Sequence, residues 1–130
     1  MRVRCVAESV TAEQGAKLGP LYQGGRQSFG VKLGSEYLVF GISVADGAVL
    51  LEIAQEYDQL YPVPMLLFEI VDPKVPSLWQ ARQSEDGTLF LWPPSFFDRE
   101  YYHQDLVEQV PSVVEDFRRV RRRLELETEL

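Results

Sequence analysis

The chain has 130 residues, of which 45% are hydrophobic and 25% are charged. These values are typical of one compact globular domain and exclude a chain that is disordered throughout. The 13 Lys and Arg residues and 20 Asp and Glu residues give a formal net charge of −7 at pH 7. That charge disfavours binding to nucleic acid phosphates and to anionic membrane surfaces.

Two further observations concern the compartment. No apolar run approaches the roughly 20 residues that cross a bilayer, and the first residues turn polar at Glu8, too early for a signal peptide. The single cysteine, Cys5, excludes an intrachain disulfide and indicates a reducing environment. We therefore expect a cytoplasmic protein that does not enter a membrane.

The N-terminal third begins with a predicted strand over residues 2–7, where charged and apolar side chains alternate. Thr11 is placed to cap a short helical turn, because its side-chain oxygen can accept a free backbone amide. Six of the nine glycines lie between Gly15 and Gly34. Residues 15–36 are therefore interpreted as a Gly-rich loop region, with a short strand near residues 29–33.

The clearest element is a hairpin formed by residues 37–44 and residues 48–54. The turn between them contains Asp46-Gly47, a pair that tolerates positive φ. In the first strand, alternation predicts one shared face for Leu38, Phe40, Ile42 and Val44. In the second strand, Ile53 is expected to face the core and Glu52 to face away from it.

Three more strands are predicted over residues 65–71, 77–82 and 88–92. The preceding prolines, Pro62 and Pro64, fix an extended segment because each disfavours helix in the residue before it. Short strands at such close spacing indicate a curved antiparallel sheet or a small open barrel of about five to six strands.

The C-terminal third changes to a helical pattern. Residues 95–109 predict one or two short helical turns, and a C-terminal helix is expected over residues 112–126. Ser112 and Glu115 have the spacing of a capping box, and the tail after the helix is expected to fray. One apolar stripe is formed by Val113, Phe117, Val120 and Leu124. The predicted class is α+β, a single domain over residues 1–130 with this helix packed on the sheet.

The sequence offers little catalytic chemistry. A nucleophile–histidine pair would have to use His103, the only histidine, and no Gly-x-Ser-x-Gly motif occurs. One Cys and one His are too few for a structural zinc site, and no phosphate-binding glycine motif is present. We therefore expect no catalytic residue, metal or cofactor. An enzyme that uses His103 and a carboxylate stays as an alternative.

Five arginines crowd into the C-terminal helix: Arg118, Arg119, Arg121, Arg122 and Arg123. Clustered guanidinium groups bind phosphates, so a small regulatory or nucleic-acid-binding module is a second alternative. Acidic residues bracket the cluster, however, and some spacings of three or four favour ion pairs within the helix. These acidic residues are Glu115, Asp116, Glu125 and Glu127. Nucleic acid is therefore the less favoured partner.

Tyrosines lie among acidic residues in two parts of the chain. The tyrosines are Tyr57, Tyr61, Tyr101 and Tyr102, and the acids near them in sequence include Glu52, Glu56, Asp58, Asp98 and Glu100. Tyrosine is enriched at protein interfaces because it supplies contact area at a low entropy cost. Acidic side chains beside it would suit a basic protein partner.

One pattern in the chain resembles a known group of proteins. It consists of Glu36-Tyr37-Leu38-Val39-Phe40-Gly41-Ile42-Ser43, then Pro62-Val63-Pro64, then Leu67-Phe68-Glu69-Ile70-Val71-Asp72 and a strand with Trp79. The pattern is similar to small bacterial immunity proteins of polymorphic and contact-dependent toxin systems, over residues 30–124. These motifs are structural, so the resemblance carries over no functional residue.

The resemblance implies a cytosolic inhibitor that binds a toxin domain made in the same cell. Such a protein needs no catalytic group, and an acidic surface would complement the basic groove of a nuclease toxin. We place the expected contact on Glu52, Glu56, Tyr57, Asp58, Glu69 and Asp72. Apolar residues on both strand faces are also compatible with a homodimer or with a covering helix.

Overall fold

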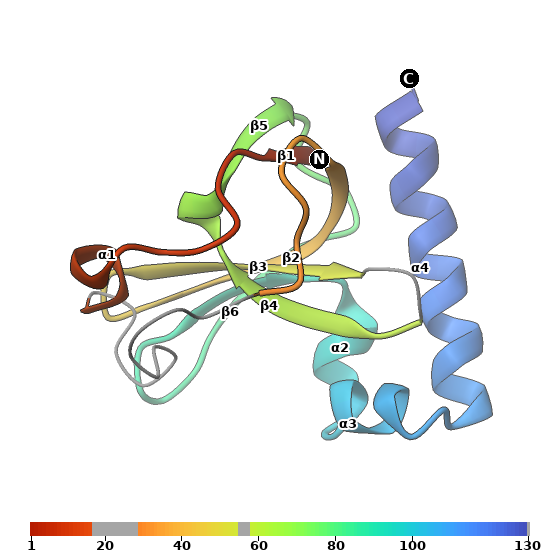
Figure 1. The fold of residues 1–130 in the computed structure, drawn as a ribbon. Helices are drawn as coiled ribbons and strands as arrows, with labels where there is room; N and C mark the ends of the chain where they lie inside the picture. The colour runs from red at the N-terminus through yellow and green to blue at the C-terminus, as the bar shows by residue number, and fades with distance from the viewer. Residues whose placement is uncertain (17–28, 55–57, 130) are drawn as a thin grey trace.

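A computed structural model describes residues 1–16, 29–54 and 58–129 of the chain, and Figure 1 shows their course. The strands are β1 (Arg2–Cys5), β2 (Glu36–Ala45), β3 (Ala48–Ala54), β4 (Leu60–Pro64), β5 (Phe68–Asp72), β6 (Gln80–Gln83) and β7 (Leu89–Trp92). The helices are α1 (Ala12–Ala16), the 3-10 turn η2 (Met65–Leu67), α2 (Pro94–Asp98), α3 (Tyr102–Val107) and α4 (Pro111–Glu129).

The strands form one antiparallel sheet of seven strands with the order β4-β3-β2-β1-β5, and β7 and β6 branch from β2. The long strand β2 joins the parts of the sheet. Residues 36–38 pair with β1, residues 42–44 pair with β7, and β3 runs along the other side. The sheet is curved and open, and α4 stands along one side of it (Figure 1). The predicted α+β class, with an open antiparallel sheet and a C-terminal helix, is confirmed.

The hairpin of β2 and β3 forms where the sequence predicts it. Its turn has positive φ at Asp46 (49°) and Gly47 (79°), which is the conformation that Asp-Gly pairs favour in two-residue turns. The predicted cap at Thr11 is also confirmed. The Gln14 amide donates to Thr11 Oγ1 at 3.1 Å, and the Thr11 amide donates to Gln14 Oε1 at 2.9 Å.

A bulge in β2 changes which residues share a face. Val39 pairs with Ile53 and Gly41 pairs with Glu52, so Phe40 is an extra residue. The expectation that Ile42 shares a face with Phe40 is therefore wrong. Phe40 packs against the helices, whereas Ile42 packs on the opposite side of the sheet.

Two hydrophobic clusters lie on the two sides of β2. The sheet core, enclosed by the curved sheet, contains Met1, Val3, Cys5, Val10, Val31, Val39, Leu51, Ile53, Val63 and Leu67. The helix core, between the sheet and the helices, contains Phe40, Leu60, Phe96, Tyr102, Leu106, Val113, Val114, Phe117, Val120 and Leu124. The predicted apolar stripe of the C-terminal helix is buried in the helix core, as the sequence pattern requires.

Helix α4 is longer at both ends than predicted. It begins at Pro111, a residue whose fixed φ suits the first helical position, and the amides of Val113 and Val114 donate to the Val110 carbonyl. Ser112 therefore lies inside the helix and the expected capping box is wrong. The sequence predicts a frayed tail over residues 125–130, but the helix continues through Glu129, and Arg2 Nε donates to Thr128 Oγ1 at 3.2 Å.

Four predicted strands differ from the structure. Two differ only at their ends, because the strand predicted over residues 2–7 covers Arg2–Cys5 and the one predicted over residues 77–82 covers Gln80–Gln83. The segment 65–71 begins with η2, where the Phe68 amide donates to the Met65 carbonyl, and only then extends as β5. The expected strand near residues 29–33 is not formed. Most of the rest of the predicted Gly-rich loop region, residues 17–28, lies outside the described residues.

Within the parts of the chain that the structure describes, no helix is both long enough and apolar enough to cross a membrane.

Candidate functional site

Of the six residues expected to bind a partner, the four that the structure describes do not form one surface. Glu56 and Tyr57 lie outside the described residues. Glu52 and Asp58 belong to β3 and to the residues before β4, whereas Glu69 and Asp72 belong to β5. In the strand order of the sheet, β2 and β1 separate β3 from β5.

Glu52 faces away from the sheet core, as strand parity predicts, but its face of the sheet is covered. The residue is only 7% exposed, and its Oε1 atom lies 3.5 Å from Nε2 of His103 on α3. Alternation along a strand shows which side a residue takes, but not what packs on that side. This carboxylate offers almost no surface to a partner.

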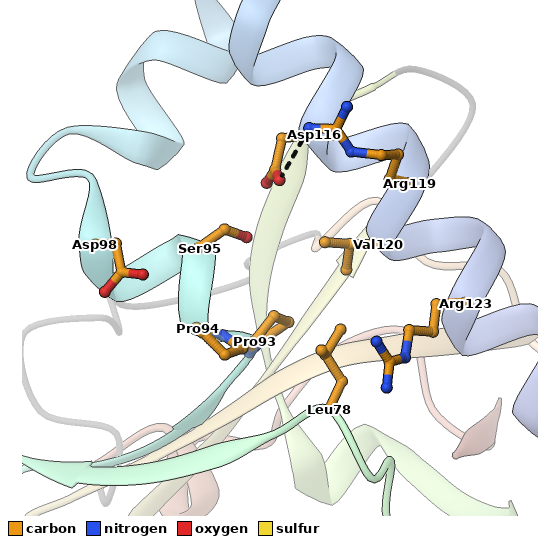
Figure 2. A pocket seen from close by; sticks show the side chains of 9 residues that line it. All are labelled: Leu78, Pro93, Pro94, Ser95, Asp98, Asp116, Arg119, Val120 and Arg123. Carbon is orange, nitrogen blue, oxygen red and sulfur yellow. Dashed lines mark ion pairs between the residues drawn. The ribbon is translucent and has the colours of Figure 1, made fainter.

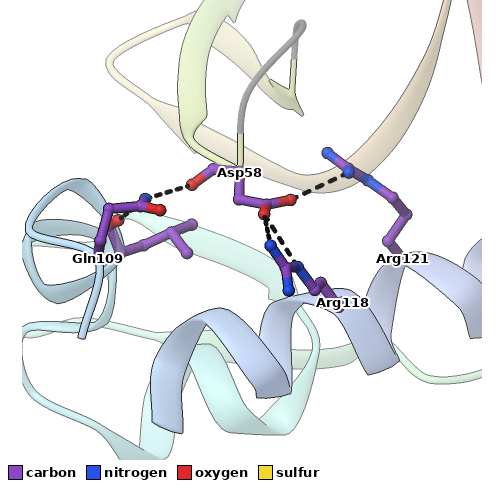
Figure 3. Close-up of polar contacts among 5 residues, drawn as sticks. Asp58, Gln109, Arg118 and Arg121 are labelled. Carbon is purple, nitrogen blue, oxygen red and sulfur yellow. Dashed lines mark hydrogen bonds and ion pairs between the residues drawn. The ribbon is translucent and has the colours of Figure 1, made fainter. Parts of the chain in front are cut away.

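Asp58 holds the start of β4 against α4 (Figure 3). Its carboxylate accepts hydrogen bonds from Arg118 Nε at 3.0 Å and Arg121 Nη1 at 3.1 Å. Its backbone carbonyl accepts one from the side-chain Nε2 of Gln109 at 3.4 Å. The Asp58 side chain is only 15% exposed. Two guanidinium groups thus neutralise this carboxylate within the chain, which is a structural role.

Glu69 and Asp72 stay on the surface, on one face of the sheet. They are three residues apart, which strand parity would place on opposite faces, but a bulge in β5 pairs Glu69 with Arg4 and Asp72 with Arg2. Arg4 Nε donates to Glu69 Oε1 at 2.8 Å. Each carboxylate therefore faces an arginine of β1, and this part of the surface is balanced in charge.

Most of the arginine cluster on α4 is also engaged. Arg118 and Arg121 bind Asp58, and Arg119 contacts Glu115 at 3.3 Å and Asp116 at 3.6 Å. The two pairs of Arg119 are the kind of intrahelical pair that the spacing favours. Among the described residues, Arg122 and Arg123 make no ion pair, so only part of the cluster could contact a phosphate.

An acidic surface with an exposed tyrosine does exist, at the corner between α2 and α3. Tyr101 is 63% exposed. The Asp98 side chain beside it is 67% exposed, and Glu100 is exposed as well. We call Asp98, Glu100 and Tyr101 the acidic corner. The sequence shows that these acidic and tyrosine residues are close together in the chain. It has no periodic pattern there that would predict which of their side chains are exposed to solvent.

A groove of about 510 Å³ runs between α2 and α4 beside the acidic corner (Figure 2). Its lining residues are Leu78, Pro93, Pro94, Ser95, Asp98, Asp116, Arg119, Val120 and Arg123. A second hollow of about 370 Å³ continues past Tyr102 and shares Ser95, Asp98 and Asp116 with the groove. The floor is apolar, and charged groups of both signs stand on the walls.

The groove has one firmly fixed carboxylate. The buried Tyr102 hydroxyl donates to Asp116 Oδ2 at 2.8 Å. Burial and this carboxylate raise the pKa of Tyr102, so the phenol stays protonated and keeps donating. One side of Asp116 is thus held by the helix core, while the residue still lines the groove.

The geometry around His103 does not favour catalysis. Its ring packs against Trp92 at 5.1 Å and Phe96 at 5.5 Å between ring centroids. Cys5 lies in the other cluster, the sheet core, where burial raises the pKa of its thiol. In the described residues, no group of three or more His, Cys, Asp or Glu side chains could hold a metal ion.

No family model, no curated protein and no solved structure matches this chain. The functional assignment therefore rests on the residues of the site itself.

Proposed function

We propose that this chain is a non-catalytic cytosolic protein-binding domain of the immunity type, which inhibits a basic toxin domain by covering it. The observation that carries the proposal is the acidic corner, where the exposed Tyr101 follows two exposed carboxylates beside a groove, and one of these carboxylates, Asp98, also lies 3.4 Å from Arg82. Aromatic side chains beside acids are typical of contacts with basic proteins. The net charge of −7 supports the same kind of partner.

The acidic corner is flanked in the chain by buried residues that anchor its backbone, which favours binding. Tyr102, which directly follows it, and Phe96, two residues before it, are each 3% exposed and belong to the helix core. A side chain that is already held loses little further freedom when a partner binds. The apolar floor of the groove could accept one apolar side chain of the partner.

This proposal moves the contact away from the residues that the sequence favoured. Glu52 is buried, Asp58 is neutralised by two arginines, and Glu69 faces Arg4. A carboxylate that is already paired gains less from a basic partner, because its own partner must first be displaced.

In the acidic corner Asp98 is also paired, with Arg82 at 3.4 Å. Glu100 has no ion pair among the described residues, so it is the carboxylate there that a basic partner can reach without displacing another group.

The test is co-expression with the product of the neighbouring open reading frame. We expect rescue of cell growth and a complex in pull-down experiments. In the variant Tyr101→Ala/Glu100→Lys, the loss of a tyrosine anchor and the reversal of one charge should weaken the complex at least about 100-fold. Isothermal titration calorimetry with the purified pair measures the change.

The matched control is Glu85→Lys. Glu85 is exposed in the turn between β6 and β7, so this variant changes the net charge as Glu100→Lys does, without touching the acidic corner. We expect it to change the affinity less than about threefold. Equal losses in the two variants would show a general charge effect and would contradict the proposed contact.

Binding of nucleic acid through Arg122 and Arg123 is the competing function. It requires salt-dependent affinity for RNA or DNA that is lost in Arg122→Ala/Arg123→Ala. We expect no measurable affinity at low salt, and a clear affinity would replace the protein-binding proposal.

A further inference from the structure

The groove between α2 and α4 carries a positive charge on its α4 wall that no described carboxylate neutralises. Helix α4 contributes the charged residues Asp116, Arg119 and Arg123 to the lining. Asp116 and Arg119 lie 3.6 Å apart and largely cancel each other. Asp116 also accepts the Tyr102 hydroxyl at 2.8 Å, and Arg119 also contacts Glu115 at 3.3 Å. The remaining charge on this wall is the guanidinium group of Arg123.

Arg123 is exposed, and it makes no ion pair with any of the described residues. Glu127, one turn further along α4, has the spacing for such a pair. The pKa of Glu127, however, is lowered mainly by its hydrogen bond with Ser77, and the charge of Arg123 makes a smaller contribution. The guanidinium group of Arg123 is therefore available to an anion from outside the chain, and its planar fork suits a carboxylate.

Apolar side chains form the floor of the groove, namely Leu78, Pro93, Pro94 and Val120. Val120 is buried in the helix core and Pro93 is fully buried, so the floor is firmly fixed. Figure 2 shows Arg123 of α4 and Asp98 of α2 on opposite sides of this floor. The volume of about 510 Å³ lies within the range of roughly 300–1,000 Å³ that is typical of ligand sites. The groove thus has room for more than one side chain.

We propose that the groove binds a short segment of the partner in which an apolar side chain is followed, toward α4, by a carboxylate. The apolar side chain lies on the floor, where it is removed from water, and the carboxylate binds Arg123. This inference deepens the proposed function and rests on it, since that function supplies the partner whose basic surface meets the acidic corner.

The α2 wall adds a preference at the other end of the segment. Asp98 carries the opposite charge to Arg123, and its contact with Arg82 is long, at 3.4 Å, with both side chains about half exposed or more. Exposed pairs of this kind are weak, so a basic side chain of the segment can take the place of Arg82. From α2 to α4, the segment is therefore basic, then apolar, then acidic.

The first test uses the free protein and needs no partner. The probe is a set of capped peptides, each with one lysine, one leucine and one glutamate separated by short glycine spacers, in both chain directions. We expect saturable shifts of the backbone amide resonances of Ser95, Val120 and Arg123 in NMR titrations. Replacing the glutamate of the tightest peptide by glutamine should weaken binding at least about tenfold, as expected for one charged hydrogen bond.

A pair of neighbouring arginines supplies the matched variants. Arg123→Glu reverses the charge in the groove, and Arg122→Glu reverses the charge of an exposed arginine that does not line it. Both change the net charge equally, and neither arginine has an ion pair among the described residues. We expect Arg123→Glu to weaken the tightest peptide at least about tenfold and Arg122→Glu to weaken it less than about twofold. If Arg123→Glu does not fold, Arg123→Gln is compared with Arg122→Gln.

The absence of saturable shifts with every peptide would overturn the inference, and so would equal losses in the two arginine variants. The same variants are then measured in the complex with the product of the neighbouring open reading frame. A complex that weakens in Tyr101→Ala/Glu100→Lys but not in Arg123→Glu leaves the proposed function in place and removes the bound segment. Peptides that bind at Arg123 without any complex contradict the proposed function and leave the groove as a peptide site.

Discussion

The two hydrophobic cores of this protein are built in different ways. The sheet core is dominated by aliphatic side chains, mostly valine, leucine and isoleucine from alternate positions of strands. The helix core depends on rings, including Phe40 stacked on Phe117 with centroids 4.9 Å apart, and Phe96 against Tyr102 at 4.6 Å. Aliphatic residues fill a closed space between strands, whereas rings bridge the wider gap between a sheet and helices.

A single bulge lets one strand serve both cores. In a regular strand, alternate residues face opposite sides, and Phe40 and Gly41 would be separated by the sheet. The bulge turns both toward the helices, so that Phe40 meets Phe117 and Gly41 receives the Trp92 ring. The two cores are therefore coupled through the backbone of β2, and each contains one tryptophan at its edge, Trp79 in the sheet core and Trp92 in the helix core.

The largest expected effect comes from Phe117→Ala. Phe117 is fully buried and stacks on Phe40, so the cavity should reduce the free energy of unfolding by about 3–5 kcal/mol. Because β2 is shared, the indole N–H signals of Trp79 and Trp92 should disappear at the same urea concentration. Urea titration followed by NMR measures both signals in one sample.

Leu51→Ala makes the matching cavity in the sheet core, where Leu51 is also fully buried. We expect a loss of about 2–5 kcal/mol and again coincident signals. Should the Trp92 signal disappear well before the Trp79 signal in Phe117→Ala, the two cores unfold separately and the coupling through β2 is refuted.

A smaller effect is expected from Gly41→Ala. The added Cβ would lie 2.5 Å from Trp92 Cδ1, so the indole must move, at a cost of about 1–3 kcal/mol in the free energy of unfolding. The change should shift the Trp92 indole resonance and leave that of Trp79 in place. Thermal or urea unfolding gives the size of the loss.

A double-mutant cycle isolates the cause of that loss. In a Trp92→Leu background the smaller side chain leaves room, so Gly41→Ala should cost less than about half of its value in the original protein. Additive losses would mean that the glycine matters for the backbone, including the Leu91 carbonyl oxygen 3.1 Å from the added Cβ, and not for the approach of the ring.

The sequence predicts well those elements that local patterns determine. The hairpin of β2 and β3 follows from alternation and from Asp46-Gly47, and the buried face of α4 follows from the spacing of Val113, Phe117 and Leu124. The bulge at Phe40 cannot be predicted in this way. The bulge turns Gly41 toward Trp92, about 50 residues further along the chain, and local alternation carries no information on that contact.

The candidate site was harder to predict for the same reason. Parity correctly turns Glu52 away from the sheet core, but only the fold brings His103 over it. The bulge in β5 places Glu69 and Asp72 opposite Arg4 and Arg2, which no spacing rule would indicate. Exposure and charge balance are tertiary properties, so a list of acids and tyrosines does not distinguish the acidic corner from paired carboxylates.

The smallest expected effect concerns the contact between the C-terminal end of α4, at Glu127, and Ser77 in the segment between β5 and β6. Hydrogen bonds from the Ser77 amide and hydroxyl to Glu127 lower the pKa of this carboxyl below its ordinary value. A lowered pKa means that the contact stabilises the protein above the ordinary carboxyl pKa of about 4.3 and is lost as the pH falls through the folded-state value. Because Glu127 is only partly buried and remains in contact with solvent, the contribution at neutral pH should stay below about 1 kcal/mol.

Glu127→Gln tests this contact. At pH 7 the variant should be slightly less stable than the original protein, and the difference should vanish as the pH falls below 4, because protonation then removes the same charge from the original protein. Urea unfolding at several pH values measures the difference. The control is Glu125→Gln, two residues earlier on α4, because no contact of the Glu125 carboxylate with Ser77 is seen; it should show no such pH-dependent difference in stability. A difference that persists unchanged in acid would mean that the last turn of α4 is fixed by Arg2 and Thr128 alone.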